Sequence, residues 1–177
     1  MLRSKSSGTS FFRSLGMLCV TLLLTGCQRE HEQSIVEFTG HIFVFNYRVS
    51  TAKYLVTLRR LSTFPEGAVA VAEYEDPQGG APLITKEALH PAIDKIVLES
   101  PPLQCVREGR PYTVTVRVMS REDEVLQTLS ARITSDFDQS ILPAKPIVVG
   151  PFYEQNPAVF KADGSKDYTP VTDCPKA

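Results

Sequence analysis

The sequence has few of the residue types that build catalytic and metal sites. It contains no tryptophan, three histidines and four cysteines among 177 residues. His31, His41 and His90 lie too far apart in the sequence to form a local metal-binding pair, and no G-x-S-x-G motif presents a nucleophile. The lack of tryptophan also argues against a sugar-stacking cleft. We therefore expect no catalytic residue, no metal ion and no bound cofactor.

Charge of one sign is not in excess either. Nineteen Lys and Arg residues balance twenty Asp and Glu residues, which leaves a formal net charge of −1. A nucleic-acid-binding protein normally carries a basic patch that neutralises phosphates. We therefore expect no nucleic-acid partner. Acidic residues gather at two expected turns, around Glu73–Asp76 and Glu122–Glu124. They could ligate Ca²⁺, but the favoured interpretation is that they solubilise the turns.

The N-terminal apolar run, residues 15–24, has about ten residues, whereas a membrane-spanning helix needs roughly 20. It follows a basic segment without acidic residues and ends in Leu24-Thr25-Gly26-Cys27. This pattern resembles the signal peptide and lipobox of bacterial lipoproteins. The resemblance implies that residues 1–26 are cleaved off and that Cys27 receives acyl chains such as palmitate. A plain signal peptide or an uncleaved segment is the alternative.

Lipidation would place the protein in the cell envelope, with the bilayer as its first partner. Gln28 follows the lipidated cysteine, and in the enterobacterial sorting rule a residue other than Asp favours the outer membrane, facing the periplasm, over the inner membrane. The remaining chain has 177 − 26 = 151 residues. Removal of three basic residues leaves 19 − 3 = 16 against 20 acidic ones, a net charge of −4. Residues 27–37 are expected to be a polar tether.

Two cysteines, Cys105 and Cys174, remain after Cys19 leaves with the leader and Cys27 is lipidated. In an exported chain we expect them to form a disulfide rather than two free thiols. The bond would fasten the C-terminal segment to the domain.

Alternation of apolar and polar residues is the main pattern after the tether. The clearest example is Tyr112–Val118, in which every second residue is apolar and the others are Thr or Arg. Residues 51–61 also fit a helical spacing, but their Val and Thr content favours a strand. The expected strands are 42–49, 53–60, 68–75, 83–88, 95–99, 112–119 and 125–134. Turns at residues 76–80 and 120–124 join neighbours, which indicates an all-β sandwich or barrel.

The segment Gly109-Arg-Pro-Tyr112-Thr-Val-Thr-Val resembles the entry to the sixth strand of fibronectin type III and immunoglobulin-like domains. There a tyrosine follows a tight turn and its hydroxyl bonds to upstream backbone. The resemblance implies a single antiparallel β-sandwich of about seven strands over residues 38–136. A fold of this kind implies no particular chemistry.

Six prolines punctuate residues 137–177, a density that excludes helix and central strand. We expect an extended arm packed on the sandwich, or one added edge strand at 147–149. Phe152 and Tyr153 are its most conspicuous side chains. The favoured interpretation is a plug over the open end of the core, and the alternative is a partner contact.

These features together predict a non-enzymatic, membrane-anchored lipoprotein that binds or scaffolds another envelope protein. The alternative is a small inhibitor or ligand carrier that uses the 150–157 loop.

Overall fold

The alternating pattern produces seven long strands in the computed structural model, which describes residues 34–171 and 174. The strands are β1 (Val36–Asn46), β2 (Thr51–Arg60), β3 (Val69–Tyr74), β4 (Leu83–Ala88), β5 (Lys95–Glu99), β6 (Pro111–Met119) and β7 (Val125–Thr134). A 3-10 helix, η1 (Gln139–Ile141), and two short strands, β8 (Val148–Val149) and β9 (Glu154–Gln155), follow them.

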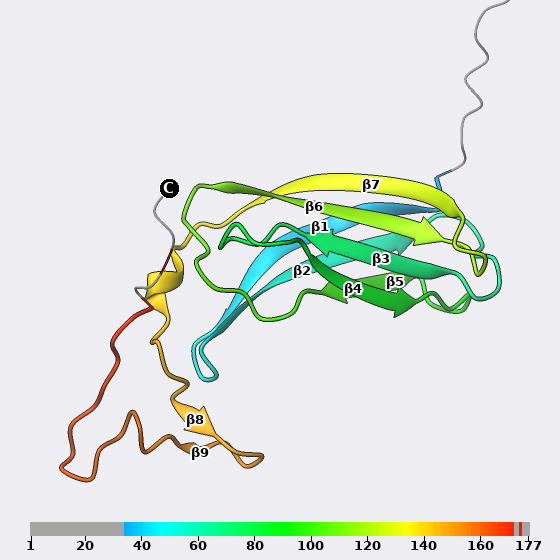
Figure 1. The fold of residues 1–177 in the computed structure, drawn as a ribbon. Coiled ribbons are helices and arrows are strands. Elements are labelled where there is room, and N and C mark those ends of the chain that lie inside the picture. The colour runs from blue at the N-terminus through cyan, green and yellow to red at the C-terminus, as the bar shows by residue number, and fades with distance from the viewer. Residues whose placement is uncertain (1–33, 172–173, 175–177) are drawn as a thin grey trace, which may run out of the picture. The chain divides into compact units, whose positions relative to one another are not determined.

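Two antiparallel sheets form the sandwich (Figure 1). One has the order β1-β2-β5 and the other β4-β3-β6-β7. This confirms the all-β sandwich that the sequence predicts, with strands three to seven at almost the expected boundaries. The predicted turns at 76–80 and 120–124 join β3 to β4 and β6 to β7, which pair as neighbours.

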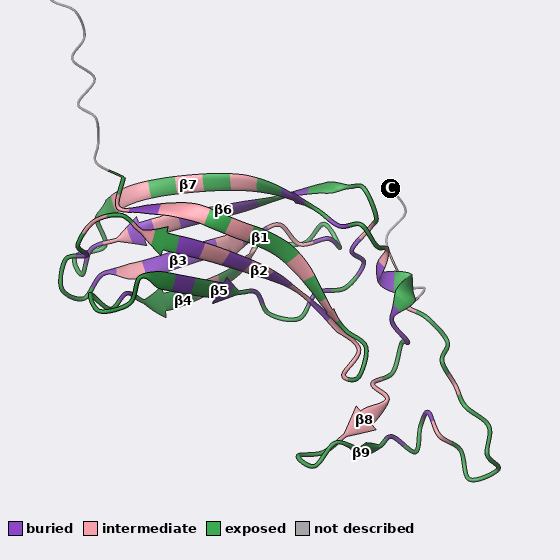
Figure 2. Cartoon of the chain, turned by 180° about the vertical axis from the view of Figure 1, so that it is seen from behind, coloured by how far each residue is buried: buried purple, intermediate pink, exposed green. Residues whose placement is uncertain are grey.

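The core lies between the sheets, because every second residue of each central strand faces inward. Buried and less buried residues alternate along β2 and β6 (Figure 2). Three tyrosines that are fully buried, Tyr54, Tyr74 and Tyr112, fill the middle of the core. The rings of Tyr54 and Tyr74 stack at a centroid distance of 5.3 Å, and Phe43 lies against Tyr54 at 4.5 Å.

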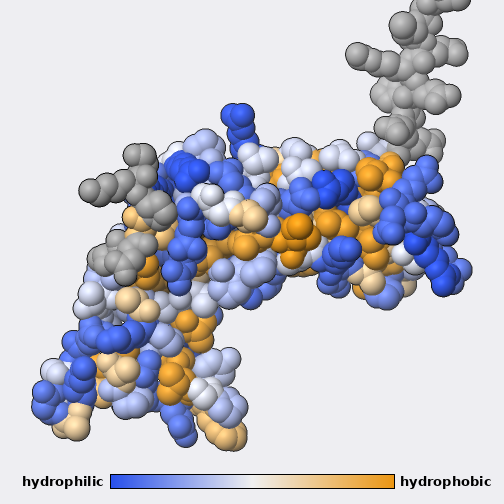
Figure 3. Space-filling view, viewed as in Figure 1, coloured by the Kyte–Doolittle hydropathy of each residue, from blue (hydrophilic) through white to orange (hydrophobic). Residues whose placement is uncertain are grey.

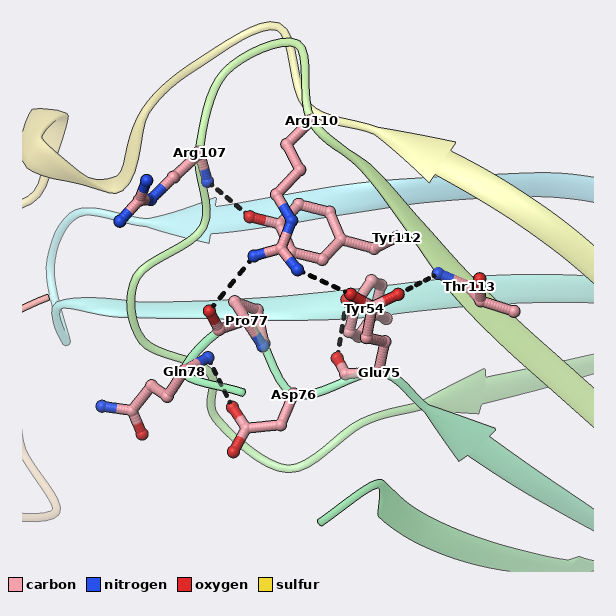
Figure 4. A network of polar contacts seen from close by, with 9 residues as sticks. All are labelled: Tyr54, Glu75, Asp76, Pro77, Gln78, Arg107, Arg110, Tyr112 and Thr113. Carbon is pink, nitrogen blue, oxygen red and sulfur yellow. Dashed lines mark hydrogen bonds and ion pairs between the residues drawn. The ribbon is translucent and has the colours of Figure 1, made fainter. Parts of the chain in front are cut away.

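Tyr112 makes the backbone contact that its position after a tight turn predicts. Its hydroxyl oxygen accepts a hydrogen bond from the Arg107 backbone N–H at 2.8 Å (Figure 4). Gly109 occupies the turn between them with φ 68°, a conformation that costs glycine little. The contact connects the turn before β6 to the strand, as in the tyrosine corner of immunoglobulin-like sandwiches.

The first strand differs from its prediction at both ends. It begins at Val36, inside the segment expected to be a tether, because Val36 is fully buried and its backbone bonds to the Gln127 carboxamide. It ends at Asn46 instead of residue 49, because the Asn46 carboxamide accepts from the Arg48 N–H at 3.1 Å and starts a turn. Tyr47 and Val49 therefore continue the pattern of alternating apolar residues in the sequence, but they lie in the turn and not in the strand. Cys27 and most of the expected tether lie outside the described residues.

Residues 143–170 form a C-terminal lobe instead of an arm laid along the sandwich. Val148–Val149 is a strand, as one expectation had it, but it pairs with β9 and adds to neither sandwich sheet. Before the lobe, η1 contacts the sandwich through Gln139, whose side chain bonds to Val106 N and Leu103 O. Figure 1 shows β8 and β9 beyond the turn that joins β1 and β2.

Candidate functional site

The most exposed aromatic side chain in the described chain is at the turn between β8 and β9. Gly150, Pro151, Phe152 and Tyr153, here called the hairpin tip, form this turn, and the Tyr153 N–H bonds to the Gly150 carbonyl at 3.3 Å. Proline has the backbone angle that the second position of such a turn requires. Phe152 is 85% exposed and Tyr153 is 58% exposed. The interpretation of these rings as a core plug is therefore wrong.

Contacts with the β1–β2 turn hold the hairpin in place. The Arg48 carbonyl accepts hydrogen bonds from Ile147 N–H at 2.9 Å and Val148 N–H at 3.2 Å. The Arg48 guanidinium lies over the Tyr153 ring, 5.0 Å from its centroid. The Ser50 hydroxyl also donates to the Pro143 carbonyl. Tyr153 is consequently engaged by the sandwich, whereas Phe152 projects alone.

Asn156 stiffens the other side of the hairpin. Its side chain donates to the Pro146 carbonyl at 2.6 Å and accepts from the Ala158 N–H at 2.9 Å, and its own N–H bonds to Ile147 O at 3.1 Å. Val159, three residues later, is completely buried. The space-filling view shows hydrophobic surface on this lobe among hydrophilic residues (Figure 3). The lobe thus has its own small packed centre, which makes the hairpin tip a fixed protrusion.

A shallow pocket of about 310 Å³ lies beside the β1–β2 turn, on the outer face of the β1-β2-β5 sheet. Val44, Val49 and Leu55 supply apolar walls. Lys53 and Glu99 line it as an ion pair with an N–O distance of 3.2 Å. Because Val49 follows Arg48 directly, the pocket and the hairpin tip share the β1–β2 turn.

The disulfide between Cys105 and Cys174 is present, with a Cα–Cα distance of 5.3 Å. Cys105 is buried at the sandwich end of the bond. Nearby in the lobe, Ala144 N–H bonds to Thr169 O at 2.7 Å, and Pro143 bridges Pro170. The disulfide therefore closes a large loop, and the Pro143–Pro170 contact closes a shorter loop inside it.

A second cluster of polar groups, at the end of the sandwich near Tyr112, has a structural role (Figure 4). Glu75 accepts from the Arg110 guanidinium at 2.8 Å and from Thr113 N–H at 2.9 Å. The Arg110 guanidinium also covers the Tyr112 ring, 4.6 Å from its centroid. The Tyr54 hydroxyl donates to the Glu75 carbonyl at 2.9 Å. Burial, with the nearby Glu75 carboxylate, raises the pKa of Tyr54, so this phenol remains a hydrogen-bond donor.

Two of the acidic residues considered as Ca²⁺ ligands form ion pairs. Glu73 pairs with Arg117, and Glu75 pairs with Arg110. Within residues 34–171 and 174, no three His, Cys, Asp or Glu side chains gather as a metal site would need. Asp163 belongs to a turn, because its carboxylate accepts from Ser165 N–H at 2.9 Å.

An exposed ion pair ties the two ends of the lobe. Lys145 Nζ donates to the Asp167 carboxylate at 2.6 Å, and the Thr169 hydroxyl donates to its other oxygen at 2.6 Å. The lysine contact, followed by the threonine bonds, lowers the pKa of the Asp167 carboxyl. The sequence pattern did not single out this pair, and Arg48 was missed in the same way, because their partners are distant in the chain.

Comparison with known proteins leaves the family open: no family model and no curated protein matches the chain. Within the described residues, the three-residue η1 is the one helical element, so no helix there could span a bilayer.

Proposed function

We propose that the protein is a non-enzymatic lipoprotein of the cell envelope that is anchored through Cys27 and binds a partner protein with its hairpin tip. The anchor is supported by the basic segment, the short apolar run and the lipobox-like Leu24–Cys27. Acyl chains at one terminus would hold the folded domain beside the membrane.

The observation that carries the binding role is the 85% exposure of Phe152 on a turn that other contacts hold rigid. Burying a phenylalanine side chain contributes about 1.5–3 kcal/mol. Little conformational entropy is lost, because Pro151 and the Arg48 contacts already fix the backbone. A protruding, preorganised aromatic group of this kind suits an apolar cleft on a folded partner.

The position of the hairpin tip agrees with such a role. β1 has eleven residues, so its two ends are separated by roughly 37 Å at ~3.4 Å per residue. The described chain enters at one end of β1, and Arg48, which contacts Tyr153, follows the other end. The tether and the hairpin tip therefore attach at opposite ends of this strand, which leaves the tip free to meet a partner away from the anchored end.

Mass spectrometry of the N-terminal peptide from purified envelopes tests the anchor. We expect cleavage before Cys27 and acyl chains on its sulfur and amino group. A bare thiol, or an intact leader, would refute the anchored protein.

Photo-cross-linking in intact cells tests the hairpin tip. A photoreactive amino acid at position 152 should give one discrete protein adduct, whereas the same group at Leu61, which is exposed beyond the far end of β2, should not. Phe152→Ser should remove partner binding and leave the free energy of unfolding within about 0.5 kcal/mol of wild type. Identical adducts at both positions, or undiminished binding by the variant, would contradict the proposal.

A second candidate function uses the same observation. A rigid hairpin with an exposed aromatic residue can also enter the cleft of an enzyme, which would make the protein an inhibitor acting through residues 150–157. Identification of the cross-linked partner separates the two, because loss of an enzyme's activity on binding is required only for inhibition.

A further inference from the structure

We infer that the free edge of β1 over Gly40–Asn46 accepts an extended strand from a partner protein, independently of the hairpin tip. β1 is the outermost strand of its sheet, and one of its two sides pairs with β2. Every second residue of an edge strand directs its N–H and C=O away from the sheet. Within the described part of the chain, the Gly40–Phe45 backbone has hydrogen-bond partners in β2 alone.

The backbone groups at the two ends of this edge differ in their hydrogen-bond partners. At the start of β1 the Gln127 carboxamide, from β7, acts in place of a neighbouring strand: its oxygen accepts from Ile35 N–H at 2.7 Å and Val36 N–H at 2.9 Å, and its nitrogen donates to Val36 O at 2.9 Å. Further along, no side chain in the part of the chain that the structure describes does this for residues 40–45.

A groove of about 400 Å³ opens beside the uncovered part of the edge. It lies between β1 and the chain that follows β7, and it is lined by residues 41–43, Phe45, 134–137 and Ile141. Phe43 and Phe45 are partly buried against the core, whereas Phe137 and Ile141 are exposed. A strand added to β1 would place alternate side chains in this groove, against the two phenylalanine rings.

The composition of the edge defines the chemistry of its occupant. Natural sheet edges are usually protected by charged residues. The other three edge strands follow this rule, with Lys86 and Glu87 on β4, Lys95 and Glu99 on β5, and Arg132 on β7. Gly40–Asn46 carries no formal charge and no proline. The occupant is therefore an extended segment whose residues beside Phe43 and Phe45 are apolar and uncharged, whereas Asp136 is the charged residue at the opposite wall of the groove.

The size of the edge favours a peptide segment over a second copy of this chain. Seven residues extend for roughly 24 Å, and a strip about 10 Å wide covers on the order of 240 Å². Stable protein pairs bury about 800 Å² per partner. An edge-to-edge dimer would have too little contact, whereas one strand can use both the backbone groups and the groove.

Hydrogen exchange with the whole chain in detergent micelles tests this inference. The probe is a nine-residue peptide of alternating valine and threonine with a lysine at each end. At probe concentrations up to about 1 mM, the probe should slow the exchange of the backbone amides of residues 40–46 in this protein. Ile42→Lys should weaken binding by about tenfold or more, because it places a charge beside the added strand.

Val125→Lys is the matched control, since Val125 is 50% exposed on the β7 edge and Ile42 is 54% exposed. This variant and Phe152→Ser should bind the probe as wild type does, which separates a failure here from a failure of the hairpin tip. Three results would overturn the inference: no protection at residues 40–46, equal weakening by both lysine variants, or a self-associated dimer that Ile42→Lys dissociates.

Discussion

Loss of the Cys105–Cys174 disulfide should destabilise the whole sandwich, not merely free its C-terminal end. The two cysteines are 69 residues apart in the sequence. The loop between them contains β6, β7 and the C-terminal lobe. On the chain-entropy model, closing a loop of about 70 residues in the unfolded chain is worth about 4 kcal/mol at 25 °C.

Removal of the disulfide should lower the free energy of unfolding by most of this amount. Pro143 bridges Pro170 through backbone contacts that do not involve the disulfide, so we expect the reduced tail to fray over only the few residues that follow Pro170. A double variant, Cys105→Ala with Cys174→Ala, keeps the buried position 105 apolar and avoids an unpaired thiol. We expect its melting temperature to fall by about 8–16 °C.

Urea unfolding followed by circular dichroism measures the effect. The transition midpoint should fall, and the m value should rise because the unfolded chain without the cross-link exposes more surface. Wild-type protein under a reductant is an independent control that should lose a similar free energy. A loss below about 1 kcal/mol in both cases would refute the reasoning, because it would mean that the loop does not restrict the unfolded chain.

Two further predictions concern single polar groups. Tyr112→Phe removes the hydroxyl that accepts a hydrogen bond from the Arg107 N–H, and we expect the free energy of unfolding in urea to fall by about 1–3 kcal/mol. Tyr47→Phe is the control, because its ring is exposed, and it should change the free energy of unfolding by less than about 0.5 kcal/mol. Equal effects of the two variants would contradict a stabilising role for the Tyr112–Arg107 hydrogen bond. Since Lys145 lowers the pKa of the folded Asp167 carboxyl, the contribution of this group is present above about pH 4 and is lost as the pH falls through its folded-state pKa. Hydrogen exchange corrected for intrinsic rates should show the lobe opening more at about pH 3 than at about pH 6, and Asp167→Asn should remove that difference.

Strand positions were predictable because burial on one face leaves a period of two in the sequence. β4, β5 and β7 coincide with their predicted ranges, and the position of Tyr112 after a turn indicated its hydroxyl contact. The ends of β1 were not predictable in the same way. In the sequence, Ile35 and Val36 are an isolated apolar pair. Their backbone N–H groups bond to Gln127, about 90 residues away, and only the tertiary structure shows this contact.

Both candidate surfaces depend on contacts that no local pattern encodes. Phe152 and Tyr153 stood out in the sequence as aromatic residues among prolines, but their sequence context fitted a core plug as well as a partner contact. The contacts of Arg48 exclude the core plug, because they hold Tyr153 and the start of the hairpin outside the core.

By itself, the sequence determined the order and faces of the strands, because the period of two depends on residues close together, and it predicted the cysteine pair by elimination. Only the tertiary structure decided which aromatic ring is exposed and which strand edge is uncovered. Both properties depend on which distant segments fold against one another, and burial is set by those partners and not by the residue itself.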